Sequence, residues 1–432
     1  MFMPPQPRFR FYGGAKNYLH VIRDVILRRV YSGEDIRRVE RKLATRTGVP
    51  EAILVPQARF GLYLVLRQLI KPGQEVILSP YTIYDVVNMV ICAGGRPVFA
   101  DVERETCNID LREVVRLANS RTAAVIATHL HGLASSIEEL ARFCKEKDIP
   151  LIEDAAQTFG GRVNGKAVGS FGDIAIFSFG RVKNVNSFYG GAVACRDRAM
   201  ADGIRAALAE LPYEATSRLV KRVAQCFLAD LLTHPLIFRT LTFWIFRYAC
   251  LQNVQSVNKL VQTEDDPVPR TEVPEVYKRR ITPMQARLID AQLDRVDEET
   301  GARIARARRY GKGLADLQQV MIPPLREDYS HIYLSYPIQV LDRWDLVRFM
   351  MRHGRDVSVQ HITNTAELSC FSEFRRDCHN ARKTAEQVVL LPTYPRYSMA
   401  EVDKTIAALR TYFSVRPHAT ADPSKQEAVL SS

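Results

Sequence analysis

Between about residues 50 and 195, the chain alternates short apolar runs with longer stretches of helical periodicity. The runs are AILVP (52–56), EVILSP (75–80), RPVFADV (96–102), AAVIATH (123–129), PLIEDAA (150–156), DIAIFSF (173–179) and GGAVAC (190–195). Because several of them are apolar at nearly every position, they indicate strands that are covered on both faces. The stretch SIEELARFCKEK (136–147) is typical of an amphipathic crossover helix. The pattern predicts an α/β fold with a mostly parallel sheet wrapped by helices.

The flanking segments predict additional units. Apolar spacing predicts a helix over residues 16–31. A helical stretch from about residue 284 precedes HIYLSYPIQV (331–340), a helix near 342–354, LLPTYP (390–395) and a last helix near 399–413. We therefore expect an N-terminal arm and helix (1–30), a large domain (31–212), a helical insertion (213–276), a smaller α+β C-terminal domain (277–416) and a disordered polar tail (417–432).

The insertion contains an unusual apolar and basic segment, residues 216–251. It combines aromatic and aliphatic residues with five basic residues, and its one acid is Asp230. Because charges interrupt every apolar run before eighteen residues, the segment is not expected to span a bilayer. Either it lies on an anionic lipid surface, or it forms a buried helical pair at a subunit interface; the pattern fits both.

Composition narrows the class of protein. The chain has 432 residues, of which 47% are hydrophobic and 25% are charged, so a largely disordered protein is excluded. The net charge of +12 suits nucleic acid, anionic lipid or acidic substrates. Zinc-finger spacing, a KH-type clamp and an RNP-like motif are all missing from the sequence, so nucleic acid is the weakest of these interpretations.

The cysteines and the N-terminus bear on the compartment. None of the eight cysteines forms a C-x-x-C or C-x-x-H pair, so neither a disulfide scaffold nor a cysteine metal site is expected. The sequence MFMPPQPRFRFYGGAK lacks the unbroken apolar core of a signal peptide. We expect a reducing, cytoplasmic location, either free or peripheral on the inner surface of a membrane.

The residues with the clearest chemistry lie between residues 151 and 193. Asp154 ends one apolar run, Gln157 follows it, Ser178 ends the next run, and Lys183 stands in a turn five residues later. A carboxylate can keep a pyridine nitrogen protonated, a hydroxyl can hold a phosphate, and a lysine can form a Schiff base. Spacing alone leaves two alternatives open, since Asp154 can cap a loop and Lys183 can be a surface lysine.

The same block resembles a known family. IEDAAQ (152–157), VGSFGDIAIFSF (168–179), FGRVKN (179–184) and YGGAV (189–193) resemble the core of the DegT-type (DegT/DnrJ/StrS-like) sugar aminotransferases. The resemblance continues upstream in PGQEVILSPYT (72–82) and downstream in RRITPMQARL (279–288) and LLPTYPRYSMAEVD (390–403). It implies a three-layer fold-type I large domain, pyridoxal 5'-phosphate (PLP) as the cofactor and no metal.

The resemblance assigns roles to individual residues. It implies that Lys183 is the Schiff-base lysine and that Asp154 pairs with the pyridine nitrogen. It further implies that Gln157 lies beside the ring and its 3-oxygen, and that Ser178 binds the phosphate. Related dehydratases carry histidine in place of Lys183, so the lysine argues for transamination.

This sequence departs from the family pattern at three places. Gln57-Ala58-Arg59 replaces a Ser-Gly-Thr-like phosphate loop, so Arg59 either binds the phosphate with its fork or blocks it. Lys278 replaces an asparagine that reaches the phosphate from the partner subunit; it is either a phosphate ligand or an exposed member of a basic run. Ile83 replaces the aromatic residue that stacks on the ring.

Two histidines in ATHLHG, His129 and His131, follow an apolar run on the expected ligand side. Each is either a site residue or a hydrogen-bonded structural residue.

The leading hypothesis is a homodimeric PLP-dependent aminotransferase with a shared active site. It would transfer an amino group from an amino acid, with glutamate the expected donor, to a nucleotide- or lipid-linked keto-sugar in polysaccharide, lipid or secondary-metabolite biosynthesis. The alternatives are a non-catalytic, membrane-associated regulatory or assembly protein on the same fold and a PLP-dependent sugar dehydratase.

Overall fold

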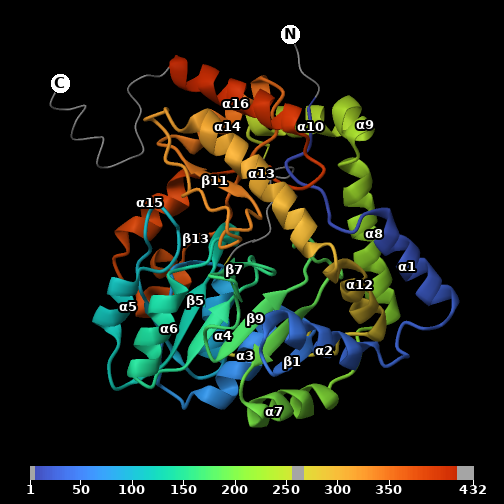
Figure 1. Ribbon diagram of the computed structural model, residues 1–432, viewed down its shortest axis with the longest axis vertical. Helices are drawn as coiled ribbons and strands as arrows, with labels where there is room; N and C mark the ends of the chain where they lie inside the picture. The colour runs from blue at the N-terminus through green and yellow to red at the C-terminus, as the bar shows by residue number, and fades with distance from the viewer. Residues whose placement is uncertain (1–4, 255–266, 416–432) are drawn as a thin grey trace.

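The computed structural model describes residues 5–254 and 267–415 and centres on a seven-stranded sheet (Figure 1). In sheet order the strands are β1 (Glu51–Val55), β10 (Gly191–Cys195), β9 (Ile174–Ser178), β6 (Leu151–Asp154), β5 (Thr122–Thr128), β2 (Glu75–Leu78) and β4 (Arg96–Phe99). In this sheet β10 runs in the direction opposite to the other six strands. Each of the seven apolar runs overlaps one of these strands, which confirms the predicted mostly parallel sheet. The predicted tail (417–432) lies outside the described residues, as do residues 255–266 of the predicted insertion.

The side chains of each strand alternate in direction, so the sheet has two apolar faces, and helices cover both of them. In β1, Ile53 and Val55 face one core, and Ala52 and Leu54 face another. The first face is covered by α3 (Ala58–Leu69), α4 (Tyr84–Cys92) and α7 (Arg198–Ala209). The second is covered by α2 (Asp35–Thr47), α5 (Leu111–Leu117), α6 (Ile137–Glu146) and α12 (Pro283–Leu293). The result is a three-layer arrangement of helices, sheet and helices.

A smaller unit packs around a second sheet. Its antiparallel strands are, in sheet order, β11 (Tyr336–Gln339), β14 (Val388–Leu391) and β12 (Ser358–Val359). Its helices are α13 (Val296–Leu314), α14 (Arg343–Arg352) and α16 (Met399–Ser414). The helical stretch predicted from residue 284 divides between α12 and α13. Because α12 packs in the core of the large sheet and α13 in the core of the small one, the segment after residue 277 serves both units.

Short elements join the two units. The two-residue strands β3 (Tyr81–Thr82) and β13 (Thr363–Asn364) pair antiparallel across them. The remaining elements of this region are α15 (His379–Gln387), the hairpin β7 (Arg162–Val163) and β8 (Lys166–Ala167), and the 3₁₀ turns η1 (Leu130–Gly132), η3 (Thr365–Glu367) and η4 (Ser369–Phe374). The pairing of β3 with β13 links the two units.

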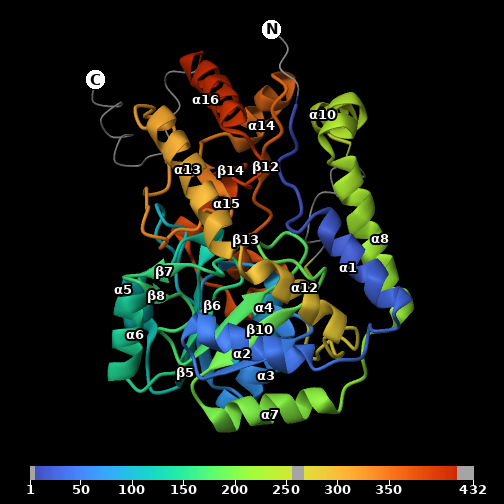
Figure 2. The ribbon, with the colours of Figure 1, turned by 45° about the vertical axis from the view of Figure 1, so that its right-hand side comes forward.

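A helical edge lies beside the two units (Figures 1 and 2). It consists of α1 (Ala15–Ile26), α8 (Thr216–Leu232), α9 (Pro235–Ile237), the π-helical turn η2 (Phe238–Thr242) and α10 (Phe243–Leu251). Val21 of α1 and Leu219 of α8 share a buried cluster with Leu288 of α12. Phe243 of α10 packs against Met351 of α14. Within the described residues, none of the helices has the length and hydropathy needed to cross a membrane.

Candidate active site

Three neighbouring parallel strands end at the candidate site. Asp154 is the last residue of β6, Ser178 is the last residue of β9, and His129 directly follows β5. Asp154 lies opposite Ile176 of β9 on one side and Thr128 of β5 on the other. Because the carboxyl ends of parallel strands meet at one edge of a sheet, the register brings these three side chains to the same edge.

The start of helix α3 lies at this same edge. Strand β10 is antiparallel to both β1 and β9, so β1 runs in the direction of β9 and leads into α3 at Ala58. The N-cap residue, Gln57, makes no side-chain capping hydrogen bond. A Cβ at Gly191 would come within 2.7 Å of the Ala58 nitrogen, so glycine allows β10 to pass close to the helix start. Uncapped N–H groups at a helix start favour an anion such as phosphate.

Lys183 lies in the loop 179–190, which connects β9 to β10. A backbone hydrogen bond of 2.9 Å closes the two ends of this loop. The side-chain amides of Asn184, Gln285 and Gln292 each donate to a backbone carbonyl of the loop or of its surroundings, at distances of 2.7 to 2.8 Å. Both glutamines belong to α12, so this helix fixes the segment that carries the lysine.

The charges of Lys183 and Asp154 influence each other. Burial lowers the pKa of Lys183 to about 8; the negative charge of Asp154 opposes this shift, and the positive charge of Arg59 adds to it. Burial also raises the pKa of the Asp154 carboxyl group, while a hydrogen bond of 3.1 Å from the Ala156 N–H and the charge of Lys183 oppose that rise. A lysine with a lowered pKa beside a buried carboxylate is a candidate nucleophile and base.

Arg59 takes part in a network that the sequence did not reveal. Its guanidinium contacts the buried carboxylate of Asp85, which also accepts hydrogen bonds from Tyr277 Oη at 2.8 Å and Arg270 Nη1 at 2.7 Å. The guanidinium also lies 5.6 Å from the centre of the Tyr277 ring. Asp85 thus balances one of two arginine charges beside the start of α3. A direct contact between Arg59 and a phosphate stays a prediction.

Gln157 and His131 connect two of the loops that follow the strands. Gln157 Oε1 accepts a hydrogen bond of 3.0 Å from the His131 N–H. Burial of the His131 ring lowers its pKa to about 4, so the ring is neutral at physiological pH. The predicted place of Gln157 beside a cofactor ring is consistent with this position at the strand ends and stays a prediction.

His129 has a structural arrangement, because both of its ring nitrogens have partners inside the protein. Its Nδ1 accepts a hydrogen bond of 3.0 Å from the Ser135 N–H, so its Nε2 carries the proton and faces Glu153 Oε2 at 3.2 Å. The ring is fully buried. Of the two alternatives, the structure therefore favours a hydrogen-bonded structural residue.

Glu153, which the sequence analysis missed, binds the loop 169–172 on the other face of the sheet from Asp154. It precedes Asp154 in β6, so its side chain points to the opposite face of the sheet. One carboxylate oxygen accepts hydrogen bonds of 2.7 Å from the N–H groups of Phe171 and Gly172, and the other accepts one of 2.8 Å from Gly169. The signal available in the sequence was an acid inside a buried run, which requires polar partners.

Lys278 lies at the surface of this chain. Its ammonium group pairs with Glu275 at 2.5 Å, and the lysine side chain is 38% exposed. It is not among the charges that shift the pKa of Lys183. Its predicted contribution to the active site of a second subunit stays a prediction.

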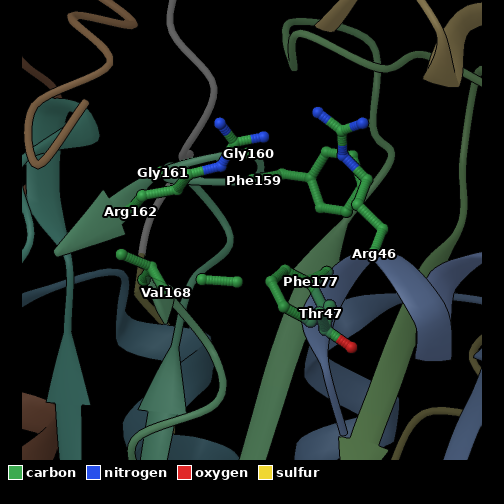
Figure 3. A pocket seen from close by; sticks show the side chains of 9 residues that line it. Arg46, Thr47, Phe159, Gly160, Gly161, Arg162, Val168 and Phe177 are labelled. Carbon is green, nitrogen blue, oxygen red and sulfur yellow. The ribbon is translucent and has the colours of Figure 1, made fainter. Parts of the chain in front are cut away.

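A separate pocket lies near α2 and the β7–β8 hairpin (Figure 3). It is lined by Arg46, Thr47, Phe159, Gly160, Gly161, Arg162, Ala167, Val168 and Phe177. Figure 3 shows the guanidinium groups of Arg46 and Arg162 on the same side of this pocket. Asp297 of α13 pairs with both arginines. None of the predicted site residues lines this pocket, so it is distinct from the site around Lys183.

Comparison with known proteins decides the family. The sequence profile of the DegT/DnrJ/EryC1/StrS aminotransferase family matches residues 16–225 and 245–410. The chain belongs to this family. The resemblance inferred from the motifs is thereby confirmed.

Individual members of the family align over different shares of the chain. The GDP-perosamine synthase of Vibrio cholerae is 39% identical over 162 residues, which are 37% of this chain and 44% of that enzyme. The dTDP-4-dehydro-2,3,6-trideoxy-D-glucose 4-aminotransferase of Saccharopolyspora spinosa is 27% identical over 383 residues, or 87% of this chain and 88% of that enzyme. The crystal structure of the aminotransferase TlmJ from Streptoalloteichus hindustanus has a TM-score of 0.73 at 22% identity, covering 96% of this chain and 99% of that one.

These findings confirm the predicted fold-type I architecture, the enzyme class and the cofactor: this family member is a PLP-dependent aminotransferase. The residues present fit PLP, which carries a pyridine ring, an aldehyde and a phosphate. The lowered pKa of Lys183 provides an amine that can lose its proton, Asp154 provides a buried carboxylate, and the uncapped start of α3 provides N–H groups for an anion.

Proposed function

We propose that this enzyme transfers an amino group from an amino acid, with glutamate as the donor, to a keto-sugar carried by a nucleotide or a lipid. The product would serve polysaccharide, lipid or secondary-metabolite biosynthesis. The observation that carries the proposal is the placement of Asp154 at the end of β6 and of Lys183 in the loop after the neighbouring strand β9, in a member of this family. The names of two relatives, which refer to a GDP-linked and a dTDP-linked sugar, support this class of acceptor.

The proposal assigns each site residue an action. Bound PLP supplies an electron sink for the carbon that gains or loses the amino group. Lys183 binds the cofactor through Nζ and moves a proton between carbon atoms, and the Asp154 carboxylate holds a proton on the pyridine nitrogen. The N–H groups at Ala58 and Arg59, with the Ser178 hydroxyl, bind the phosphate, and Gln157 orients the ring.

A half-reaction tests the amino donor. The PLP-loaded protein is mixed with glutamate, with another amino acid or with no donor, and the 2-oxo acid released per subunit is measured. We expect 2-oxoglutarate from glutamate in an amount equal to the active sites. The aminated protein is then offered GDP-, dTDP- and lipid-linked keto-sugars. A dehydratase would return the sugar without an added amino group, and a non-catalytic protein would release no 2-oxo acid, so either result would refute the proposal.

The lowered pKa of Lys183 predicts how PLP uptake depends on pH. Only the neutral amine attacks an aldehyde, so the rate of covalent PLP uptake by the apoprotein should rise about tenfold per pH unit and level off above the pKa, about 8. Stopped-flow absorbance from pH 6 to about 10 measures this rate. Because the charge of Arg59 lowers this pKa, Arg59→Gln should move the midpoint to higher pH. A wild-type midpoint near the ordinary lysine value would contradict the expectation.

We also propose that the enzyme is a homodimer in which the partner subunit's Lys278 reaches the site. Light scattering gives the number of subunits. If the site is shared, Lys183→Met and Lys278→Glu subunits should each be inactive alone and regain activity when refolded together, because one of the two sites in the mixed dimer is then intact. Absence of recovery in a proven mixed dimer would contradict the shared site.

A cytoplasmic location belongs to the same proposal. All eight cysteines are free thiols, and five of them are buried. Free thiols are typical of proteins from reducing compartments, which supports this location.

A further inference from the structure

The helical edge exposes an apolar surface of unusual extent. Leu19 and Ile26 of α1, Leu228 of α8, and Leu236, Leu241 and Tyr248 of the α9–α10 region are each between 53% and 72% exposed. Large exposed apolar surfaces on soluble proteins mark interaction sites. Figure 2 shows α1, α8 and α10 along one edge of the molecule, and Figure 1 shows α9 at the end of α8. We call this set of outer helix faces the helical-edge surface.

The inner faces of these helices are already in use. Tyr18 of α1 packs its ring edge-to-face on Phe227 of α8 at 5.3 Å, next to the buried cluster that contains Val21 and Leu219. The helix α10 is anchored on α14 through the buried Phe243. The outward apolar residues are therefore additional to those that hold the helices in place.

The charges around the helical-edge surface have one sign. Between residues 15 and 31 and between residues 215 and 254 the only acids are Asp24 and Asp230. Both are buried and paired, Asp24 with Arg287 at 2.7 Å and Asp230 with Arg10 at 3.4 Å. The exposed basic residues of the two segments include Lys16, Arg23, Arg28, Arg29 and Lys221. The solvent-facing side is thus apolar and basic, without an exposed acid in these two segments.

The centre of this surface is not part of the sequence shared by the family. The family profile leaves residues 226–244 unmatched, and Leu228, Leu236 and Leu241 fall in that gap. The family fold therefore does not require these apolar side chains. Trp244 is the last residue of the unmatched stretch, and the Arg247 guanidinium lies 5.4 Å from the centre of its ring. Aromatic and basic side chains together are favoured at the interface between water and lipid.

We propose that the helical-edge surface docks on an anionic membrane surface, with the apolar side chains among the lipid headgroups and the basic residues on the lipid phosphates. This occupant matches both the apolar and the basic character of the surface. A second copy of the chain matches only the first, because a two-fold contact would bring like charges together. The proposal concerns where the enzyme binds and does not depend on the identity of its amino acceptor.

Vesicle flotation tests the proposal with the full-length, PLP-loaded protein. The wild type should float with phosphatidylcholine vesicles that contain about one third phosphatidylglycerol and should remain unbound with phosphatidylcholine alone. Leu236→Gln combined with Leu241→Gln should lower the partition coefficient about 10-fold or more. Arg28→Gln combined with Lys221→Gln should lower it about 25-fold, since each of the two basic residues contributes about fivefold near an anionic surface.

Matched control variants separate this docking from general effects of substitution. Val115→Gln with Leu325→Gln changes two similarly exposed apolar residues elsewhere, and Lys145→Gln with Lys147→Gln changes two exposed bases at the end of α6. Both pairs should bind vesicles like the wild type. Failure of the wild type to float, or equal binding by surface and control variants, would overturn the proposal. So would a wild-type dimer that the leucine variant converts to a monomer without vesicle binding, because the occupant would then be a second copy.

Discussion

Replacing Lys183 by methionine should lower the rate of amino transfer by at least about 1,000-fold. Methionine keeps the length of the side chain and removes the amine whose pKa the site lowers to about 8. Initial rates with glutamate and the accepted keto-sugar measure the loss. Borohydride reduction makes the bond between PLP and its amine permanent. Peptide mass analysis should then find PLP on Lys183 in the wild type and on no residue of this site in the variant.

The same substitution should stabilise the apoprotein, which excludes unfolding as the cause of the lost activity. The pKa of Lys183 is lower in the folded than in the unfolded chain, so burial of its charge costs stability in full below about pH 8, and this cost disappears as pH rises toward the ordinary lysine value. The variant should therefore melt at a higher temperature than the wild type at pH 7, with a smaller difference near pH 10. The exposed Lys145, changed to methionine, serves as control; retained turnover in Lys183→Met would refute the assigned role.

Replacing Glu153 by glutamine should reduce the free energy of unfolding by about 3 kcal/mol. The two carboxylate oxygens of Glu153 face four donors: three backbone N–H groups and the His129 ring. An amide offers a single accepting oxygen and turns its own N–H₂ group toward at least one of these donors. Urea unfolding of the apoprotein, followed by tryptophan fluorescence, measures the change.

The exposed acid Glu139 on α6, changed to glutamine, provides a matched control that should alter stability by less than about 0.5 kcal/mol. Because Glu153 lies directly beneath the strand end that carries Asp154, PLP affinity should fall together with stability. An unchanged urea midpoint would show that the four hydrogen bonds do not carry the stability assigned to them.

The sheet could be predicted because most of its strands are buried on both faces. That environment leaves a continuous apolar run, and the seven runs became the seven strands of one sheet. The gathering of Asp154, Ser178 and Lys183 at one edge followed from the same fact, since residues after parallel strands end together. The division between α12 and α13 was missed, because helical periodicity continues through Asp294 and Arg295 while the packing partner changes.

The polar networks around the site could not be predicted in the same way. Asp85, Arg270 and Tyr277 meet Arg59 from positions up to 218 residues away in the chain, and nothing in a local pattern records such a contact. The exposed outer face of α1 shows a related limit. Its apolar spacing indicated a helix correctly, but periodicity does not say whether the apolar face turns toward a core or away from it.

The direction of β10 determines how the reactive amine is held. Since β10 runs against β9, the segment with Lys183 is the closed end of a hairpin whose two stems lie in the interior of the sheet. A backbone hydrogen bond between Phe179 and Gly190 and the two glutamines of α12 restrain this segment, so uptake of PLP should cost little additional conformational entropy. The apoprotein is thus preorganised for its cofactor. The fraction of Lys183 that is neutral, more than any rearrangement of the chain, should determine the rate of PLP uptake.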